Sequence, residues 1–218
     1  MHNRFTLIVV LNNKRAMLTY TYYGMTSVLL STLQTCLSDR LMSLFNFKPN
    51  DVAIYFFLFF VGALTCSLIC AFLSRQCDKS VVILISLFIC SFSLLLIGPS
   101  SILHFPPVRE VVGIGLYFGG AYNSLSNYAV SQALVFTESD IHVHEYGDLV
   151  NSASALRPIF SGLGLFSGPI VGGLLMKYLG FSHMCEIYSL IFLVFAMIEF
   201  TIILRERRTA TNQRSIIH

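Results

Sequence analysis

Charged residues are scarce in this chain of 218 residues. They make up 11% of the sequence, whereas 55% of the residues are hydrophobic. Soluble domains carry about 25% charged residues. A soluble fold of this size leaves much of its surface in water and could not hide so much apolar surface. The composition therefore excludes an ordinary soluble domain and predicts that lipid surrounds most of the chain.

The sequence also lacks the motifs of several other classes of protein. The net charge is only +3 and no long basic run occurs, so binding to nucleic acid is not expected. No glycine-rich phosphate loop precedes a helix, which argues against an ATP-driven pump, and no cofactor is predicted. The six cysteines contain no CxxC pair, and four of them lie in apolar runs. They are expected to be small buried hydrophobic residues, not a disulfide framework or a zinc site.

Apolar runs long enough to cross a bilayer occur six times. Backbone groups in lipid must be satisfied within their own segment, so these runs are expected to be helices and not strands. The sequence therefore predicts an all-α membrane protein with six transmembrane helices. The predicted spans are 16–36, 51–73, 80–98, 111–135, about 149–176, and 185–204.

The connections between these runs are short, so no second domain is expected. The predicted loops cover 40–50, 74–79, 99–107, 137–148 and 177–183. Residues 16–205 would form one membrane domain between an N-terminal tail, 1–15, and a C-terminal tail, 206–218. The apolar stretch 5–11 is short and no small-residue cleavage site follows it, so it is read as part of the tail. Basic residues are more numerous on the side of the two termini, which places both tails in the cytoplasm.

Polar side chains mark one face of the first span and one face of the fourth. Asn123 and Asn127 are four residues apart and therefore share a helix face. Two interpretations stay open: hydrogen bonds between helices, or the wall of a cavity that binds a solute. The stripe of the first span consists of Tyr20, Tyr23, Ser27, Ser31 and Gln34.

Arg157 is the one charge well inside a predicted span. A charge within the membrane suggests a functional site, although the side chain could also extend to the inner surface or form a local pair. Glu199, near the inner end of the sixth span, reaches the surface more easily. No catalytic residue is predicted. His142, His144 and Glu145 lie together in an acidic loop, but two histidines in a soft loop are more often solvated than metal-bound, so no metal site is predicted. The predicted solute-binding residues are Tyr20, Tyr23, Asn123, Asn127 and Arg157.

The fifth span carries glycines at a spacing of four, which leaves a groove without side chains along one face. Pro169 lies within this run and removes one backbone donor, so a kink is expected there. Such a helix can pack closely and bend, which suits a helix that rocks against a partner. The motif residues are Gly164, Gly168, Pro169, Gly172 and Gly173.

This pattern resembles the glycine–proline "antiporter" motif of major facilitator transporters. In facilitators the motif begins with a further glycine, nine residues before the position of Gly164, where this chain has Ala155. A second likeness is the loop 71–79, which resembles the G-x-L-[AS]-D-[RK] loop that joins the second and third helices of each facilitator half. Ala71 and Arg75 stand in place of its glycine and aspartate.

Further segments are similar to the vesicular amine and polyamine transporters, the solute carrier 18 group, in its B-type branch. They are Leu96-Ile97-Gly98-Pro99, Ile102-Leu103-His104, Tyr146-Gly147 and Gly180-Phe181. The resemblance covers about residues 16–205, as helices seven to twelve of a facilitator. It implies proton-coupled exchange of a small cationic solute by alternating access, with no enzymatic activity. Since facilitator halves surround a central site, it also implies a missing N-terminal half or a second copy as partner.

Two other classes share the hydropathy. A non-transporting membrane protein could pair with full-length transporters and regulate them. An intramembrane serine protease would need Gly-x-Ser-Gly, but Leu165-Phe166 precede Ser167-Gly168. We therefore predict a multi-pass protein of a vesicle or plasma membrane. Its expected partners are the bilayer and a small solute.

Overall fold

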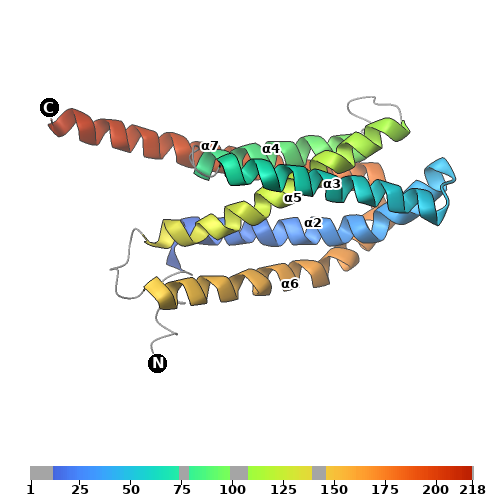
Figure 1. Ribbon diagram of the computed structural model, residues 1–218, viewed down its shortest axis with the longest axis horizontal. Helices are drawn as coiled ribbons and strands as arrows, with labels where there is room; N and C mark the ends of the chain where they lie inside the picture. The colour runs from blue at the N-terminus through green and yellow to red at the C-terminus, as the bar shows by residue number, and fades with distance from the viewer. Residues whose placement is uncertain (1–11, 74–78, 99–107, 139–145, 218) are drawn as a thin grey trace. The chain divides into compact units, whose positions relative to one another are not determined.

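The computed structural model describes residues 12–73, 79–98, 108–138 and 146–217. Within these ranges the chain forms helices and no strand (Figure 1). The all-α prediction is therefore confirmed for the described residues. The helices are α2 (Lys14–Phe45), α3 (Pro49–Leu73), α4 (Lys79–Ile97), α5 (Arg109–Glu138), α6 (Tyr146–Leu179) and α7 (Phe181–Ile217).

Four of these helices are long and apolar enough to cross a bilayer. The stretches are Pro49–Cys70, Ser80–Ile97, Ser154–Leu179 and Phe181–Glu206. They indicate a membrane protein, because a run of about 20 apolar residues matches the hydrocarbon thickness. The described parts of α2 and α5, which carry the two polar stripes, are not among the four.

Helix α2 is longer than the sequence suggested. The loop expected from residue 40 was wrong in its extent, because the helix continues to Phe45 and leaves only 46–48 as the connection to α3. Leu41 is buried and holds the extra turns against the protein. The helix ends where Asn46 adopts the left-handed conformation, with φ 52° and ψ 39°.

Helices α6 and α7 also meet more tightly than expected. The predicted loop 177–183 shrinks to Gly180, since α6 runs to Leu179 and α7 begins at Phe181. Gly180 has φ +83°, which a glycine adopts without steric cost. Its amide donates to the carbonyl of Met176 at 3.1 Å, and its own carbonyl accepts from the amide of Met184 at 3.1 Å. One residue thus ends one helix and starts the next.

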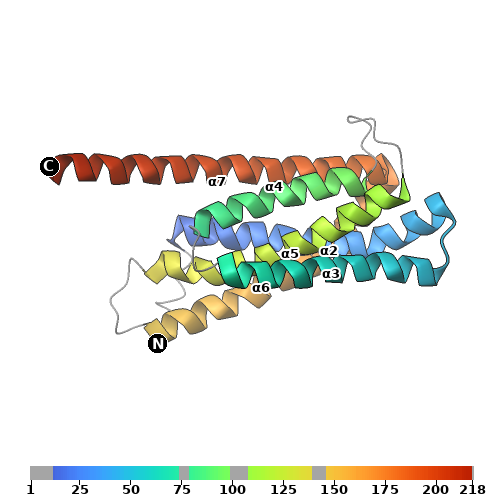
Figure 2. The same cartoon turned by 45° about the horizontal axis from the view of Figure 1, so that its top comes forward.

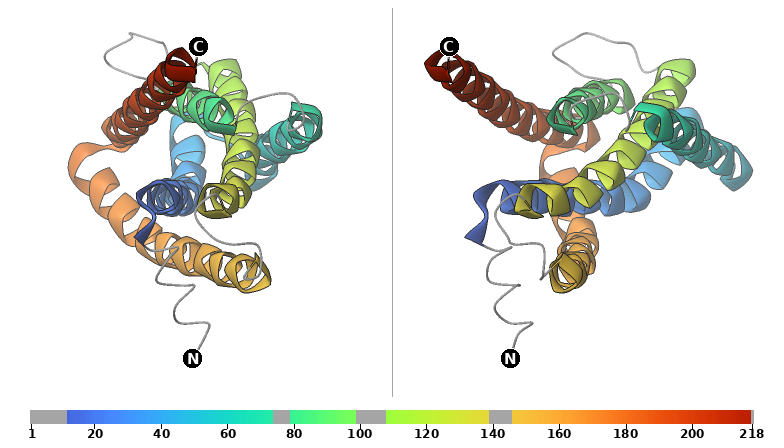
Figure 3. Two further views of the ribbon diagram at one scale, coloured as in Figure 1. Left: turned by 90° about the vertical axis from the view of Figure 1, so that its left-hand side faces the viewer. Right: turned by 60° about the vertical axis from the view of Figure 1, so that its left-hand side comes forward.

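The helices fold as two compact units. The first unit comprises residues up to Phe57 together with Ser126–Met184, and the second comprises Leu58–Leu125 and the residues from Cys185 onward. Helices α3, α5 and α7 each contribute to both. The first unit is built on α2 and α6, which run side by side in the same direction (Figures 1 and 2). Helix α6 is curved along its length (Figure 3).

In the second unit, glycines bring α3 and α5 into backbone contact. A methyl group at Gly62 would overlap the carbonyl of Tyr117, and one at Gly120 would overlap the carbonyl of Phe59. The hydroxyls of Thr65 and Tyr117 are 2.8 Å apart across the same interface. Small residues let helices approach in this way within a bilayer.

Helix α4 is tied to its neighbours in the second unit by serines. Ser93 Oγ donates to the carbonyl of Gly115 on α5 at 2.8 Å. Ser91 Oγ lies 2.7 Å from Ser189 Oγ on α7. All three serines are buried, and buried hydroxyls need such partners.

Candidate functional site

The interface between α2 and α6 in the first unit is a close contact of parallel helices. A methyl group at Gly164 would lie 2.5 Å from the carbonyl oxygen of Gly24, and one at Gly168 would lie 2.6 Å from the carbonyl oxygen of Val28. A methyl group at Gly172 would overlap the side chain of Thr32. Residues later in α6 thus contact residues later in α2, as expected for two helices that run in the same direction. The predicted groove of Gly164, Gly168 and Gly172 faces α2.

The other glycine of the motif takes no part in this contact. Nothing lies within 4 Å of the position that a Cβ atom would take at Gly173, and the same holds for Gly162. Both residues are on the uncovered side of α6. The motif therefore divides into three glycines that touch α2 and one that does not.

Pro169 leaves one carbonyl of α6 without its helical donor. In an α-helix the amide of residue i bonds to the carbonyl of residue i−4, so proline at 169 frees the carbonyl of Leu165. Ser31 Oγ of α2 donates to that carbonyl at 3.0 Å. The neighbouring helix thus supplies the hydrogen bond that the proline removes.

Two more hydrogen bonds follow the same interface. Thr32 Oγ1 donates to the carbonyl of Gly168 at 2.8 Å, and Ser27 Oγ donates to Ser161 Oγ at 3.3 Å. Ser27 and Ser31 of the predicted polar stripe therefore bond to α6, as in the first of the two interpretations. Gln34, the last residue of the stripe, is exposed.

Three of the five predicted solute-binding residues come together at the α2–α6 interface. Arg157 Nε donates to the hydroxyl of Tyr23 at 3.3 Å, and the guanidinium lies over the Tyr23 ring, 5.6 Å from its centre. Arg157 Nη2 donates to Asn127 Oδ1 of α5, which also accepts from the Tyr23 hydroxyl at 3.3 Å. We call Tyr23, Asn127 and Arg157 the Arg157 cluster. It joins three helices of the first unit.

The cluster is covered on one side and open on the other. Tyr23 is 8% exposed and Asn127 is half-buried, whereas Arg157 is exposed. The guanidinium therefore lies over the buried Tyr23 ring and bonds to Asn127, while the Arg157 side chain as a whole stays exposed. This arrangement fixes the direction of its hydrogen-bond donors.

The remaining two predicted residues lie elsewhere. Tyr20 is 1% exposed, and its ring stacks on Phe160 of α6 with 5.7 Å between ring centres. It packs the interface and presents no open surface to a solute. Asn123 is half-buried on the part of α5 that belongs to the second unit, one turn before Asn127. The two asparagines that share a helix face thus belong to different units.

Ser161 and Thr32 are interface residues that the sequence reasoning did not single out. The signal was present for Ser161, because positions 157, 161, 164, 168 and 172 follow helical spacing. That face begins with a charge, continues with a serine and ends with glycines. The stripe as a whole would have placed Arg157 on the same packing face as the three glycines, although not against a particular helix.

The other polar residues considered in the sequence give no second site among the described residues. No group of three or more metal-ligating side chains occurs in the described part of the chain. Glu199 of α7 is 5% exposed, so it lies inside the second unit and not at its surface. His142 and His144, most of the loop 71–79 and the segment from Pro99 to His104 lie outside the described residues.

Comparison with known proteins adds no relative. The chain matches no protein-family model, and no curated protein sequence matches it.

Proposed function

We propose that this chain is a six-helix half of a secondary transporter that moves a small solute across a membrane by alternating access. The observation that carries the proposal is the α2–α6 interface. It combines a glycine contact, a helix interrupted by proline and a cluster of polar side chains around a charge. Two helices that only pack together need the glycine contact, but they do not need an exposed charged side chain such as Arg157.

The parallel packing of α2 and α6 supports six spans. Helix α6 is apolar enough to cross a bilayer, and α2 lies along it over several turns, so α2 is expected to occupy the same layer. Two spans can run in parallel only when an odd number of crossings lies between them. Helices α3, α4 and α5 supply three. The polar character of α2 and α5 then reflects side chains that face the protein.

The glycine contact supports relative movement of the two helices. The three glycines of α6 add no side chains of their own to the contact with α2, and Pro169 weakens the helix in the middle of the contact. Ser31 compensates for the lost backbone bond from outside the helix. A bond to a neighbouring helix can be exchanged when the helices shift, whereas a bond within the helix cannot.

One half provides one wall of a central solute site. Facilitator-like transporters bind their solute between two such halves. The exposed side of α6 carries large apolar side chains, among them Leu163 and Phe166, which are 64% and 75% exposed. A second half or a second copy of this chain is the partner expected on the open edge of the Arg157 cluster.

Flux measurements on the purified chain test this proposal. Proteoliposomes would be loaded with an equimolar set of small amines and organic acids, and mass spectrometry would follow which of them leaves, with and without a pH gradient. Saturable efflux that is lost in Gly168→Ala and kept in Gly173→Ala is the expected result. Efflux equal to that of empty liposomes would contradict transport by this chain alone and would favour a membrane protein that regulates full-length transporters.

A further inference from the structure

We infer that the Arg157 cluster binds an anionic oxygen group, a carboxylate or a phosphate, and not an amine. The part of this inference that makes the anion a transported ligand rests on the proposed function. The contacts around Arg157 carry the inference. They differ from what the resemblance to amine transporters would imply.

The guanidinium has hydrogen-bonding capacity to spare. It carries five N–H donors, of which one on Nε reaches Tyr23 and one on Nη2 reaches Asn127. The three other donors make no hydrogen bond to any residue that the structure describes. Because Arg157 as a whole is exposed, a ligand can approach these donors.

Among the residues whose side chains the structure describes, none compensates the charge of Arg157. Its partners are a phenol and an amide, both neutral, and no described aspartate or glutamate forms an ion pair with it. Unsatisfied donors and an unpaired charge are costly beside lipid. An anion with two oxygen atoms would satisfy both, because a guanidinium offers parallel donors that match a carboxylate or a phosphate.

The same geometry is unfavourable for a cationic solute. Tyrosine rings attract cations, but the Tyr23 face is already covered by the guanidinium at 5.6 Å. The ring of Tyr20 is stacked on Phe160. An ammonium group brought to the open edge would meet the like charge of Arg157 a few ångströms away, which is repulsive.

Tyr23 and Asn127 act as positioning residues in this proposal. They accept hydrogen bonds from Nε and Nη2 of the guanidinium, so the direction of its other donors is fixed before a ligand arrives. Such preorganisation lowers the entropic cost of binding. A flexible surface arginine without these contacts would bind the same anion more weakly.

The test is an NMR titration of the full chain, labelled with ¹⁵N-arginine, in nanodiscs of phosphatidylcholine. The Arg157 side-chain signal is identified by its absence in Arg157→Lys. Inorganic phosphate, acetate and methylammonium are added in separate titrations at constant ionic strength. A saturable shift with phosphate or acetate, and none with methylammonium, is expected. Nanodiscs that contain phosphatidylglycerol form a second arm, which reveals an anionic lipid headgroup as the source of the ligand.

Variants give an independent readout. Anion binding is measured by the thermal stabilisation that it produces. Arg157→Gln should weaken this binding by about tenfold or more, since a charged hydrogen-bond donor is lost. Arg157→Lys should retain part of it, because the charge remains but the paired donors do not. Lys177→Gln is the matched control, as Lys177 is an exposed cation of the same helix that also lies over a tyrosine ring, that of Tyr178, at 5.7 Å.

Each outcome decides between the sources or against the inference. A response to soluble anions in neutral lipid supports a solute site. A response to phosphatidylglycerol alone supports anion recognition but assigns it to lipid and removes the cluster from the solute path. No Arg157-dependent response in either arm, or an equal response to methylammonium, would overturn the inference. If the chain binds anions but shows no flux in liposomes, the transport proposal is refuted while the inference of an anion-binding site still holds.

Discussion

The hydroxyl of Ser31 donates to the carbonyl of Leu165 across the α2–α6 interface, at 3.0 Å. Pro169 leaves that carbonyl without a donor in its own helix, so a residue 134 positions earlier in the chain completes the backbone bonding of α6. The relationship ties a helix break to a specific neighbour. It also makes the interface testable by mutation, because either residue can be changed alone or together.

Ser31→Ala should destabilise the protein, and Pro169→Ala should remove most of that effect. Alanine at 169 restores the amide that bonds to Leu165, so the serine is no longer needed. We expect a coupling free energy of about 1 kcal/mol in the double-mutant cycle, the size measured for hydrogen bonds between membrane helices. Thermal unfolding followed with a thiol-reactive dye is suitable, since Cys36, Cys66, Cys70, Cys90 and Cys185 are buried. Equal effects of Ser31→Ala in both backgrounds would contradict the pairing.

Gly168→Ala should weaken the α2–α6 contact. The added methyl would lie 2.6 Å from the carbonyl oxygen of Val28 and 2.7 Å from Ser31 Cβ, so the helices must separate. Overpacking of this kind costs about 1–3 kcal/mol. Gly173→Ala is the matched control, because nothing lies within 4 Å of its added methyl and alanine favours the helix. A comparison of the two melting temperatures checks the prediction, and a Gly168→Ala protein as stable as Gly173→Ala would refute the close contact.

Gly120→Ala and Gly119→Ala form a second pair, in the second unit. At Gly120 the methyl would overlap the backbone carbonyl of Phe59, which cannot rotate away. At Gly119 the nearest atom is Ser93 Oγ at 3.1 Å, a small side-chain atom that can shift. Gly120→Ala should therefore lower the unfolding temperature clearly more than Gly119→Ala. Similar values for the two variants would show that α3 and α5 do not approach as described.

The sequence was sufficient for the helical fold and for part of the cluster. Helix identity follows from apolar length, and the spacing of 164, 168 and 172 predicts a packing face. Sequence could not predict that α2 is the helix on that face, because partner choice depends on tertiary contacts. It also grouped Tyr20 with Tyr23 as predicted solute-binding residues, whereas the structure buries Tyr20 against Phe160. A helical stripe wide enough for both tyrosines covers a packing surface as well as a polar one. Phe160, whose ring stacks on Tyr20, is apolar, so no polar pattern in the sequence marks this contact.

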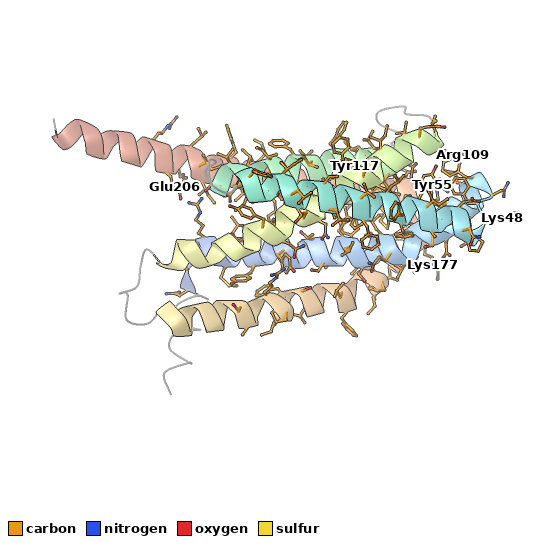
Figure 4. The ribbon with its side chains drawn as sticks, viewed as in Figure 1. Lys48, Tyr55, Arg109, Tyr117, Lys177 and Glu206 are labelled. Carbon is orange, nitrogen blue, oxygen red and sulfur yellow. The ribbon has the colours of Figure 1, made fainter. Side chains whose placement is uncertain are left out.

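Labelling of cysteines from one side of the membrane should distinguish six spans from four. Lys48 and Lys177 lie at the same end of the first unit (Figure 4). If all six helices cross, Lys48→Cys and Lys177→Cys react with an impermeant thiol reagent from the same side, and Arg208→Cys reacts from the opposite side. If only the four most apolar helices cross, α3, α4 and α6 are the three crossings between positions 48 and 177, so Lys48→Cys and Lys177→Cys lie on opposite sides. The native cysteines of the described helices are buried, and Cys77, outside the described residues, is replaced by serine. Opposite labelling of positions 48 and 177 would rule out the parallel pair of spans on which the transporter proposal depends.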